Sequence, residues 1–328
     1  MQPDATLPEE ERLRTERETY PELVARLSRL SVTKHYDAYA DIPWDDAQYR
    51  IDSRDPTWEL DQAHPLGGTA WYREQPSEMR SRIGLHYVVC SMHTGTYFEN
   101  VLTRGLFEFA LLLPNTAPEF RYAYHEAIEE TQHSLMFREF VNRAGLEPGD
   151  PSALVRAGGR RVVRMARRFP ELFFLFVLGG EDPIDYVQRR SLRKNRDDLH
   201  PLFRRIMQIH VTEEARHMSF ARHALRKRVP ELTSSRRWRL GLCVPIILGV
   251  MGRMMMEASP QIAREYNIPR EVVDGAYRKS PIHSARIHEA STKLFGLCDE
   301  LGLINRWSLR LWRMMRILPH ASALVPAH

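Results

Sequence analysis

Two short segments of this chain repeat the same spacing of carboxylate and imidazole side chains. Glu130 and His133 are three residues apart, and Glu214 and His217 repeat this interval 84 residues later. Each pair lies in a long stretch without proline or glycine, in which apolar residues recur every three or four positions, as in an amphipathic α-helix. Positions i and i+3 of a helix share one face, so each pair can present both groups to one cation. Two such helices that face each other could hold two metal ions side by side.

Each pair is preceded by a glutamate at nearly the same distance. Glu99 lies 31 residues before Glu130, and Glu181 lies 33 residues before Glu214, each beside an apolar run. A lone carboxylate in such a run is costly to bury unless it meets a cation. Glu108 competes with Glu99, but the longer interval leaves more room for a helix, a turn and a second helix. Two glutamates and two Glu-x-x-His pairs on four helices are the ligand pattern of dinuclear carboxylate bundles, and these donors suit iron, with manganese as the alternative metal.

Residues next to the pairs are further candidates. His210 precedes Glu214 by four residues and shares its helix face, but spacing alone leaves it open between a ligand and a buried structural histidine. Glu126 precedes Glu130 by the same four residues. It could be an extra ligand, a partner of an inner imidazole or a solvated residue. A metal-bound histidine normally donates its outer N–H to a carboxylate or a carbonyl. The candidates for this supporting role are Glu126, Glu129, Asp185 and Glu213.

Four long helical stretches are predicted around these residues. Alternating strand-like runs are scarce, and no βαβ rhythm is present. Breaks are expected near Gly95 and at Gly179, Gly180 and Pro183, because glycine and proline weaken helix interiors. The fold class is therefore all-α, with a four-helix bundle core. The four stretches cover about 78–112, 118–143, 170–194 and 200–228.

The chain is predicted to form one domain over residues 1–328. Residues 35–70 carry several prolines and glycines, with Trp44 and Trp58 between them, and are expected to wrap irregularly around the body. The predicted parts are an N-terminal helix and wrap at 1–75, the metal-binding bundle at about 76–230 and a C-terminal helical extension at 231–328. Other helices are predicted at 8–30, at 152–168 and through 233–320.

Cysteine use and charge argue against several classes of protein. The three cysteines, Cys90, Cys243 and Cys298, are far apart and form no Cys-x-x-Cys pair. A disulfide framework, a zinc ribbon and a thiolate-held iron–sulfur cluster are therefore not expected. With no secretory signal pattern at the N-terminus, the expected location is the cytoplasm. The formal net charge of +5 says little about partners, and no nucleic-acid-binding pattern accompanies it.

Neither a membrane span nor an internal electron carrier is predicted. The longest uncharged apolar run, Leu240–Gly252, has thirteen residues, whereas a span needs roughly 20. No Gly-x-Gly-x-x-Gly motif follows a strand, so no nicotinamide or flavin site is expected and electrons must come from outside the chain. The apolar helix at 240–256 is a candidate face for a homodimer.

Two basic segments are interpreted as ordinary surface. Residues 160–168 are rich in arginine, which favours a solvated helix face. Residues 306–316 interleave arginine with tryptophan and leucine, as helices at a membrane surface do. A surface helix that packs its apolar side inward is the favoured interpretation there.

At the repeated pairs the sequence resembles the ferritin-like di-iron oxygenases and, among them, the p-aminobenzoate N-oxygenase family. That family has a third histidine ligand, and the run His210-x-x-x-Glu214-x-x-His217 matches its spacing. The resemblance covers roughly residues 30–230 and implies a ferritin-like four-helix bundle with additional N- and C-terminal helices. The implied metal ligands are Glu99, Glu130, His133, Glu181, His210, Glu214 and His217.

The resemblance implies a non-haem di-iron enzyme, with two iron ions as its cofactor and O2 as co-substrate. Oxygen would be activated as a bridging peroxo species and transferred to a small organic substrate, with the nitrogen of an (aryl)amine as the first choice. A ferredoxin or a reductase is the implied electron donor. An apolar lining would exclude water, and its candidates are Phe98, Leu102, Phe137, Phe174 and Met218.

Three other functions fit the same ligands. Related bundles hydroxylate or desaturate C–H bonds. A ferritin-like ferroxidase would oxidise iron without an organic substrate, although such subunits are typically shorter. A radical-generating subunit would need a tyrosine near the metals, and Tyr97 and Tyr124 are the candidates in this sequence.

Overall fold

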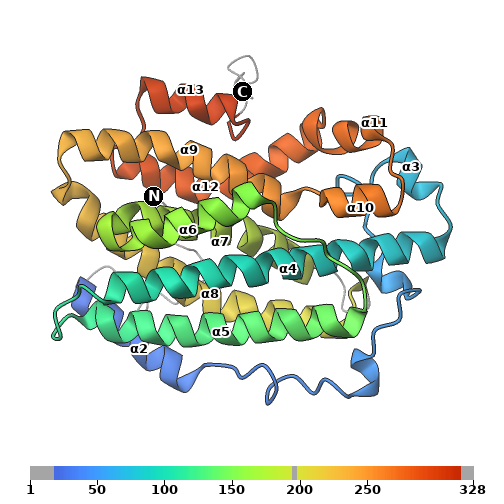
Figure 1. Cartoon of the computed structure of the whole chain (residues 1–328), viewed down its shortest axis with the longest axis horizontal. Coiled ribbons are helices and arrows are strands. Elements are labelled where there is room, and N and C mark those ends of the chain that lie inside the picture. The colour runs from blue at the N-terminus through green and yellow to red at the C-terminus, as the bar shows by residue number, and fades with distance from the viewer. Residues whose placement is uncertain (1–17, 194–197, 319–328) are drawn as a thin grey trace.

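The computed structural model describes residues 18–193 and 198–318, and these residues contain no strand. The predicted all-α class is therefore confirmed. Four long helices form the core of the molecule, close to the bounds that the sequence predicts (Figure 1). They are α4 (Ser77–Ala110), α5 (Pro118–Ala144), α7 (Pro170–Leu192) and α8 (Pro201–Arg228).

Local sequence signals set the ends of these helices. Pro118, Pro170 and Pro201 begin α5, α7 and α8. Proline suits the first helical position because its backbone angle is already helical and its missing N–H has no partner there. Gly145 ends α5 with a φ of 62°, a left-handed conformation that glycine adopts without strain.

The predicted breaks inside α4 and α7 are wrong. α4 runs through Gly95, and α7 runs through Gly179, Gly180 and Pro183. A Cβ at Gly180 would clash with the ring of Phe98, so this glycine lets α4 and α7 approach closely. The residues from Gly179 to Pro183 are all buried. Tertiary contacts therefore hold together a helix that glycine and proline would weaken in isolation.

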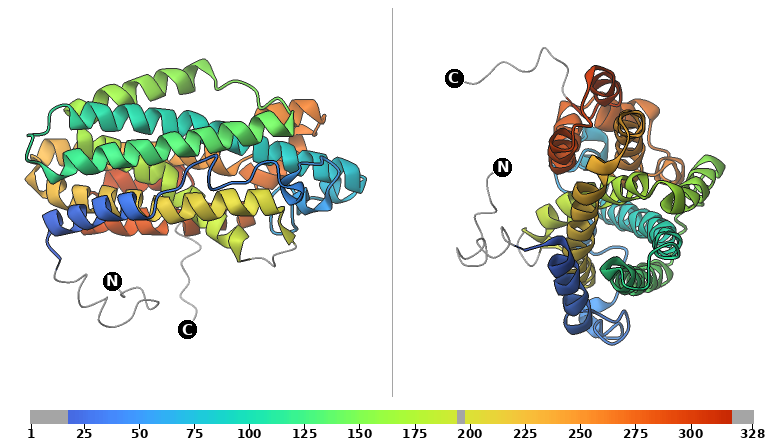
Figure 2. Two further views of the ribbon diagram at one scale, coloured as in Figure 1. Left: turned by 90° about the horizontal axis from the view of Figure 1, so that it is seen from below. Right: turned by 90° about the vertical axis from the view of Figure 1, so that its left-hand side faces the viewer.

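The long helices pack as two hairpins. α4 packs along α5, and α7 packs along α8, so that the middles of all four surround a common interior (Figure 2). A further helix, α2 (Tyr20–Thr33), packs against α5 and α8. It corresponds to the end of the helix predicted at 8–30, of which residues 8–17 lie outside the described part of the chain.

The segment between α2 and α4 is irregular, as its prolines and glycines predict. Trp44 and Trp58 are 6% and 4% exposed and attach it to the body. The Trp58 ring stacks on that of His200, with 4.3 Å between their centroids. Its short helical turns are η1 (Ala47–Tyr49), η2 (Pro56–Trp58) and α3 (Ala70–Arg73).

The remaining helices cover one side of the bundle (Figure 1). The predicted basic helix, α6 (Ala153–Arg168), packs across α4 and α7. After the turn η4 (Val229–Glu231), helix α9 (Ser234–Met256) packs against α7, α12 and α13. The stretch Ser234–Glu265 is long and apolar enough to cross a membrane, but 56% of its most apolar window is buried inside the protein. The last elements are α10 (Pro260–Glu265), α11 (Arg270–Val273), η5 (Asp274–Arg278), α12 (Pro281–Glu300) and α13 (Arg306–Met314).

Candidate metal centre

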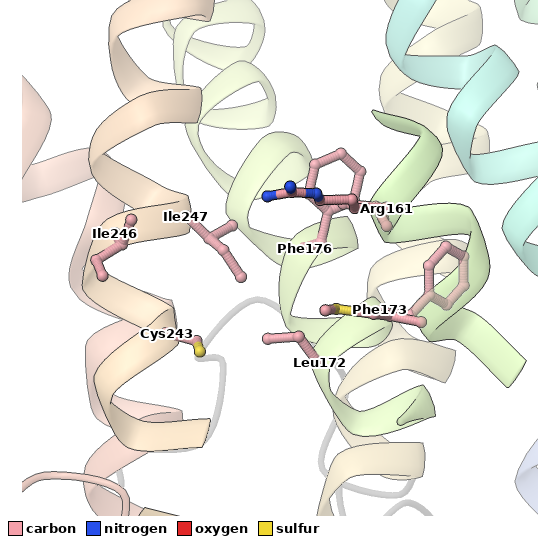
Figure 3. Close-up of a pocket in the computed structure, with 9 residues that line it drawn as sticks. Arg161, Leu172, Phe173, Phe176, Cys243, Ile246 and Ile247 are labelled. Carbon is pink, nitrogen blue, oxygen red and sulfur yellow. The ribbon is translucent and has the colours of Figure 1, made fainter. Parts of the chain in front are cut away.

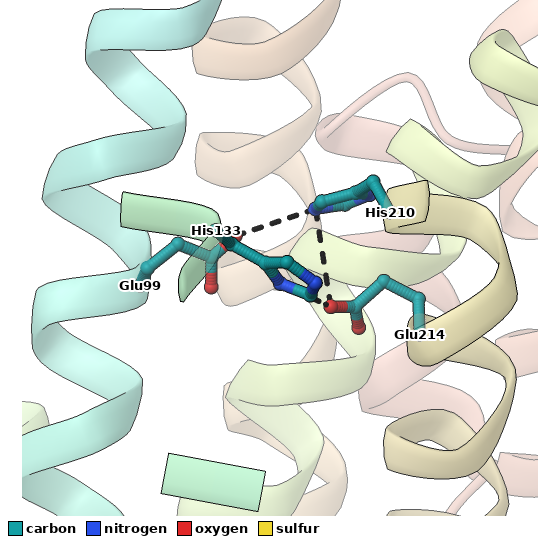
Figure 4. A group of neighbouring side chains, drawn as sticks. All are labelled: Glu99, His133, His210 and Glu214. Carbon is teal, nitrogen blue, oxygen red and sulfur yellow. Dashed lines mark hydrogen bonds and ion pairs between the residues drawn. The ribbon is translucent and has the colours of Figure 1, made fainter. Parts of the chain in front are cut away.

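The seven predicted ligands lie together in the middle of the bundle. α4 supplies one of them, α5 two, α7 one and α8 three. None of these residues is more than 2% exposed. Figure 4 shows four of them converging from α4, α5 and α8. They are Glu99, Glu130, His133, Glu181, His210, Glu214 and His217.

Donor atoms form two overlapping groups that each fit one cation. In one group Glu99, His133, His210 and Glu214 offer atoms within 4.8 Å of one another, and in the other Glu214 joins Glu130 and His217. Oε1 of Glu214 lies 3.3 Å from Nδ1 of His133 and 3.1 Å from Nδ1 of His217.

The carboxylate of Glu130 also lies between the two imidazoles. One of its oxygens is 3.3 Å from Nδ1 of His133, and the other is 3.1 Å from Nδ1 of His217. Glu130 and Glu214 therefore each lie within 3.3 Å of both imidazoles.

Unpaired carboxylate oxygens give a direct test of whether a metal fits. Oε2 of Glu99, both carboxylate oxygens of Glu181 and Oε2 of Glu214 are buried without a hydrogen-bond partner in the described residues. Burial and the neighbouring carboxylates raise the pKa of Glu99 and of Glu181 well above the ordinary value. Burying a charge is costly unless it is paired or bound to a metal. Two divalent cations would remove this cost, so the residues fit a dinuclear metal centre.

The carboxylates around His133 and His217 favour positive charge on these two imidazoles. Burial alone would lower the pKa of His133 and of His217, but the surrounding carboxylates hold both well above the ordinary value. Burial and Glu214 act to raise the pKa of Glu130, yet its contacts with the two imidazoles lower it to about 2. Positive charge is thus favoured at the place where the metals would bind.

Two of the predicted supporting carboxylates hold these imidazoles from behind, each from the opposite helix. Nε2 of His133, on α5, lies 3.0 Å from Glu213 of α8. Nε2 of His217, on α8, lies 2.7 Å from Glu129 of α5. An Nε2–H that donates outward leaves Nδ1 of each ring for a cation. Arg216 connects the two carboxylates, with Nη2 at 2.7 Å from Glu129 and 3.3 Å from Glu213.

The irregular segment closes this side of the centre. The backbone N–H of Tyr36 donates to Glu213 at 3.0 Å, and that of Ala38 donates to Gln132 at 2.9 Å. Sequence reasoning missed Arg216 and Gln132. Their positions in the sequence could have indicated them, because each directly precedes the histidine of a Glu-x-x-His pair.

The third histidine faces the centre with its other nitrogen. Nε2 of His210 lies 3.4 Å from Glu99 and 3.8 Å from Glu214, while Nδ1 lies 3.0 Å from the side-chain oxygen of Gln188. Burial lowers the pKa of His210 to about 4, although Glu214 acts to raise it. His210 is thus a neutral imidazole at pH 7. Sequence reasoning missed Gln188, which lies seven residues after Glu181 on α7.

Two predicted supporting residues have different surroundings from those expected. Asp185 pairs with Arg189 at 2.6 Å and lies 4.0 Å from Lys293, and it contacts no imidazole of the centre. Glu126 is buried rather than solvated, at 1% exposure, and its Oε2 has no hydrogen-bond partner in the described residues. Glu108 is only partly buried, unlike Glu99.

The tyrosines considered for a radical lie elsewhere. The hydroxyl of Tyr97 donates to the carbonyl of Val155 on α6 at 3.0 Å, and Tyr124 is 44% exposed. A different tyrosine, Tyr122, is fully buried four residues before Glu126 and packs on Phe220.

A cavity of about 80 Å³, open to solvent, adjoins the ligands on one side. Glu99, Glu181 and His210 form part of its wall, together with Gln188. Phe98 and Phe137 line it, as predicted, together with Met92, Met207 and Met255. The other predicted lining residues lie in the packed core instead, and these are Leu102, Phe174 and Met218.

Comparison with known proteins decides the family. The sequence profile of the p-aminobenzoate N-oxygenase AurF matches residues 17–302, which is most of the chain. The chain belongs to the p-aminobenzoate N-oxygenase family. The ferritin-like fold inferred from the resemblance is confirmed with it.

This chain is also similar to proteins of mycobacteria. Uncharacterized proteins of Mycobacterium bovis and Mycobacterium tuberculosis are 37% identical to this chain over 299 residues, covering 91% of it and 87% of each relative. No solved structure matches the chain. Membership indicates a di-iron oxygenase, and the buried Glu/His cluster is where its metal can bind.

Proposed function

We propose that this chain is an O2-dependent di-iron oxygenase that transfers oxygen to a small, uncharged organic molecule, with the nitrogen of an aryl amine as the preferred acceptor. The observation that carries the proposal is the buried set of four glutamates and three histidines beside a cavity. Family membership supports the oxygenase class. Two iron ions, once bound, would supply the redox chemistry that activates O2, which no side chain can provide.

The roles proposed for the residues follow from their positions. Glu130 and Glu214 would bridge the metals, with His133 and His217 as one imidazole ligand each. Glu99 and Glu181 would hold the metals from α4 and α7. His210 would add a neutral donor at the cavity wall, where it adds no charge next to the substrate.

The cavity supports an uncharged substrate. Its remaining wall combines aromatic and methionine side chains with the hydroxyls of Ser91, Ser191 and Tyr87. Burying a carboxylate against such a surface is costly, whereas an aromatic ring would be well accommodated. We therefore expect aniline-like amines to be better substrates than p-aminobenzoate itself. Phe98 and Phe137 would keep water away from the reacting atoms.

The electron donor, the location and the oligomeric state are also part of the proposal. The electrons would come from an external ferredoxin or reductase, the cytoplasm would be the location, and the chain would form a homodimer. The three cysteines are free, which supports a reducing compartment.

The first experiment is iron loading of the anaerobically purified protein, followed by exposure to O2 and a screen of amines. We expect two irons per chain, a transient optical band after O2 and oxygenation of aniline. Consumption of O2 without any oxygenated amine would favour a C–H hydroxylase or desaturase, which hydrocarbon substrates would reveal, or a ferroxidase. Absence of bound iron would overturn the proposal.

A further inference from the structure

A second hollow lies between α6, α7 and α9 (Figure 3), on the other side of Phe176 from Phe98 of the cavity wall, with 5.1 Å between the centroids of the two rings. It is an open groove of about 190 Å³. Phe173 and Phe176 of α7 form one side, and Ile246 and Ile247 of α9 form the other. Arg161 of α6 extends its guanidinium over the groove beside Phe176 (Figure 3). An apolar trough with a cation at its edge matches a molecule that has an apolar chain and an anionic head.

Two of the three helices that line this groove, α6 and α9, carry basic but no acidic residues, as does the neighbouring α13, whereas α7 carries acidic residues as well. α6, α9 and α13 contain no aspartate or glutamate, and none of their arginines lies within 4 Å of a carboxylate in the described residues. Because the net charge of the whole chain is only +5, the rest of the chain is net negative. The positive charge is therefore concentrated on these three helices. The arginines are Arg156, Arg160, Arg161, Arg164, Arg167 and Arg168 of α6, Arg236, Arg237, Arg239 and Arg253 of α9, and Arg306, Arg310 and Arg313 of α13.

Large apolar side chains are exposed among these arginines. Leu154 and Met165 of α6 are 82% and 41% exposed, and Ile246 of α9 is 47% exposed. Trp238, near the start of α9, and Trp307, on α13, are 49% and 44% exposed. Tryptophan next to basic residues is characteristic of helices that lie in the interface of a membrane.

We propose that the α6–α9–α13 face docks onto an anionic lipid bilayer, with an acyl chain entering the groove and its phosphate near Arg161. The arginines would bind the headgroups, and the exposed apolar side chains would enter the headgroup region. The enzyme would then draw apolar substrates or contact its electron donor at a membrane surface, without spanning it.

Charge and shape favour this occupant over others. A second copy of the chain would bring two arginine-rich faces together, which repel each other, so a homodimer would use a face other than the one suggested at 240–256. A nucleic acid would use the arginines but not the aliphatic trough, since nucleic-acid surfaces offer phosphates and stacking bases. An acidic protein would satisfy the charge, so it is a competing outcome in the test.

The test is co-sedimentation of the full chain, loaded with iron, with vesicles of phosphatidylcholine alone or with about one third phosphatidylglycerol. We expect binding only to the anionic vesicles, and we expect high salt to abolish it. Each arginine near an anionic surface contributes about fivefold to binding. The triple variant Arg160→Gln, Arg161→Gln and Arg164→Gln should therefore bind about a hundredfold more weakly, and Ile246→Ser about tenfold more weakly.

The matched control lies on α2, on the opposite side of the molecule (Figure 2). Arg29→Gln with Val32→Ser removes one exposed arginine and one exposed apolar residue there and should bind like the unmodified chain. Equal iron content in all variants shows that they are folded. Equal binding to both vesicle types, or full binding by the triple variant, would overturn the proposal. The proposal would also be wrong if the chain bound neither vesicle type but bound polyglutamate in a way that requires these arginines. That result would assign the face to an acidic protein.

Discussion

The two hairpins of the bundle supply matching groups to the centre. In each, the first helix contributes one buried glutamate to the centre and the second contributes a Glu-x-x-His pair. The second helices also support each other symmetrically, since Glu129 of α5 contacts His217 of α8 and Glu213 of α8 contacts His133 of α5. Neither hairpin can therefore orient its own imidazole, and each depends on the other.

The hairpins differ four residues before their paired glutamates. There α8 carries His210, and α5 carries Glu126. His210 lies at the cavity wall and is held by Gln188, whereas Glu126 lies in the interior away from the cavity. Equivalent positions in a repeated motif therefore have different surroundings because the cavity adjoins only one side of the centre. The third imidazole therefore lies on the side of the cavity, where we propose that the substrate binds.

The largest expected effect comes from the carboxylates between the two imidazoles. Glu130→Gln or Glu214→Gln should lower iron affinity more than about 100-fold and abolish oxygenation, because each removes a charge that both metals share. Iron per chain after desalting, compared with the partly exposed Glu108→Gln, measures this. If either variant kept two irons and full activity, the dinuclear assignment would be wrong.

The next effect tests the difference between the hairpins. His210→Ala removes a neutral donor from only one of the two donor groups. We expect one iron to bind about 10- to 100-fold more weakly while the other is retained. Stepwise iron titration followed by Mössbauer spectroscopy separates the two sites. Unchanged spectra of both irons would make His210 a structural histidine.

A smaller effect tests the symmetry behind the centre. Glu129→Gln and Glu213→Gln each weaken the orientation of one imidazole, and each should lower iron affinity about tenfold. Competition with a chelator measures both variants side by side. Arg216 contacts both carboxylates, whereas the N–H of Tyr36 contacts only Glu213. Clearly different iron affinities of the two variants would mean that this extra contact holds Glu213 more firmly than Glu129 is held.

The smallest effect is expected at Glu126. Because its Oε2 has no partner and the residue is absent from both donor groups, Glu126→Gln should leave iron content unchanged. The free energy of unfolding should change by less than about 1 kcal/mol, since an amide of the same shape replaces a buried carboxyl group. Chemical denaturation of the iron-loaded protein measures it. Loss of one iron would instead make Glu126 a ligand and remove the difference between the hairpins.

Local patterns predicted the four long helices well. The candidate ligands that they indicated lie together in the structure, and metal binding by these residues stays a prediction. Helical spacing and proline or glycine signals placed α4, α5, α7 and α8 to within a few residues. Interactions between distant segments were not predictable in this way. Three contacts at the centre join residues that are 22 or more positions apart in the sequence. They are those of Gln188 with His210, of Arg216 with Glu129 and of the Tyr36 backbone with Glu213.

The sequence by itself indicated that four helices bring their glutamates and histidines together. Burying carboxylates in apolar helices costs free energy unless a cation neutralises their charge. Only the tertiary structure decided that α7 continues through Gly180 and Pro183, that His210 rather than Glu126 faces the cavity, and that α6 and α9 enclose an apolar groove. The physical reason is that helix periodicity assigns a residue to a face of its own helix. Which surface that face meets depends on packing between helices, which no local spacing specifies.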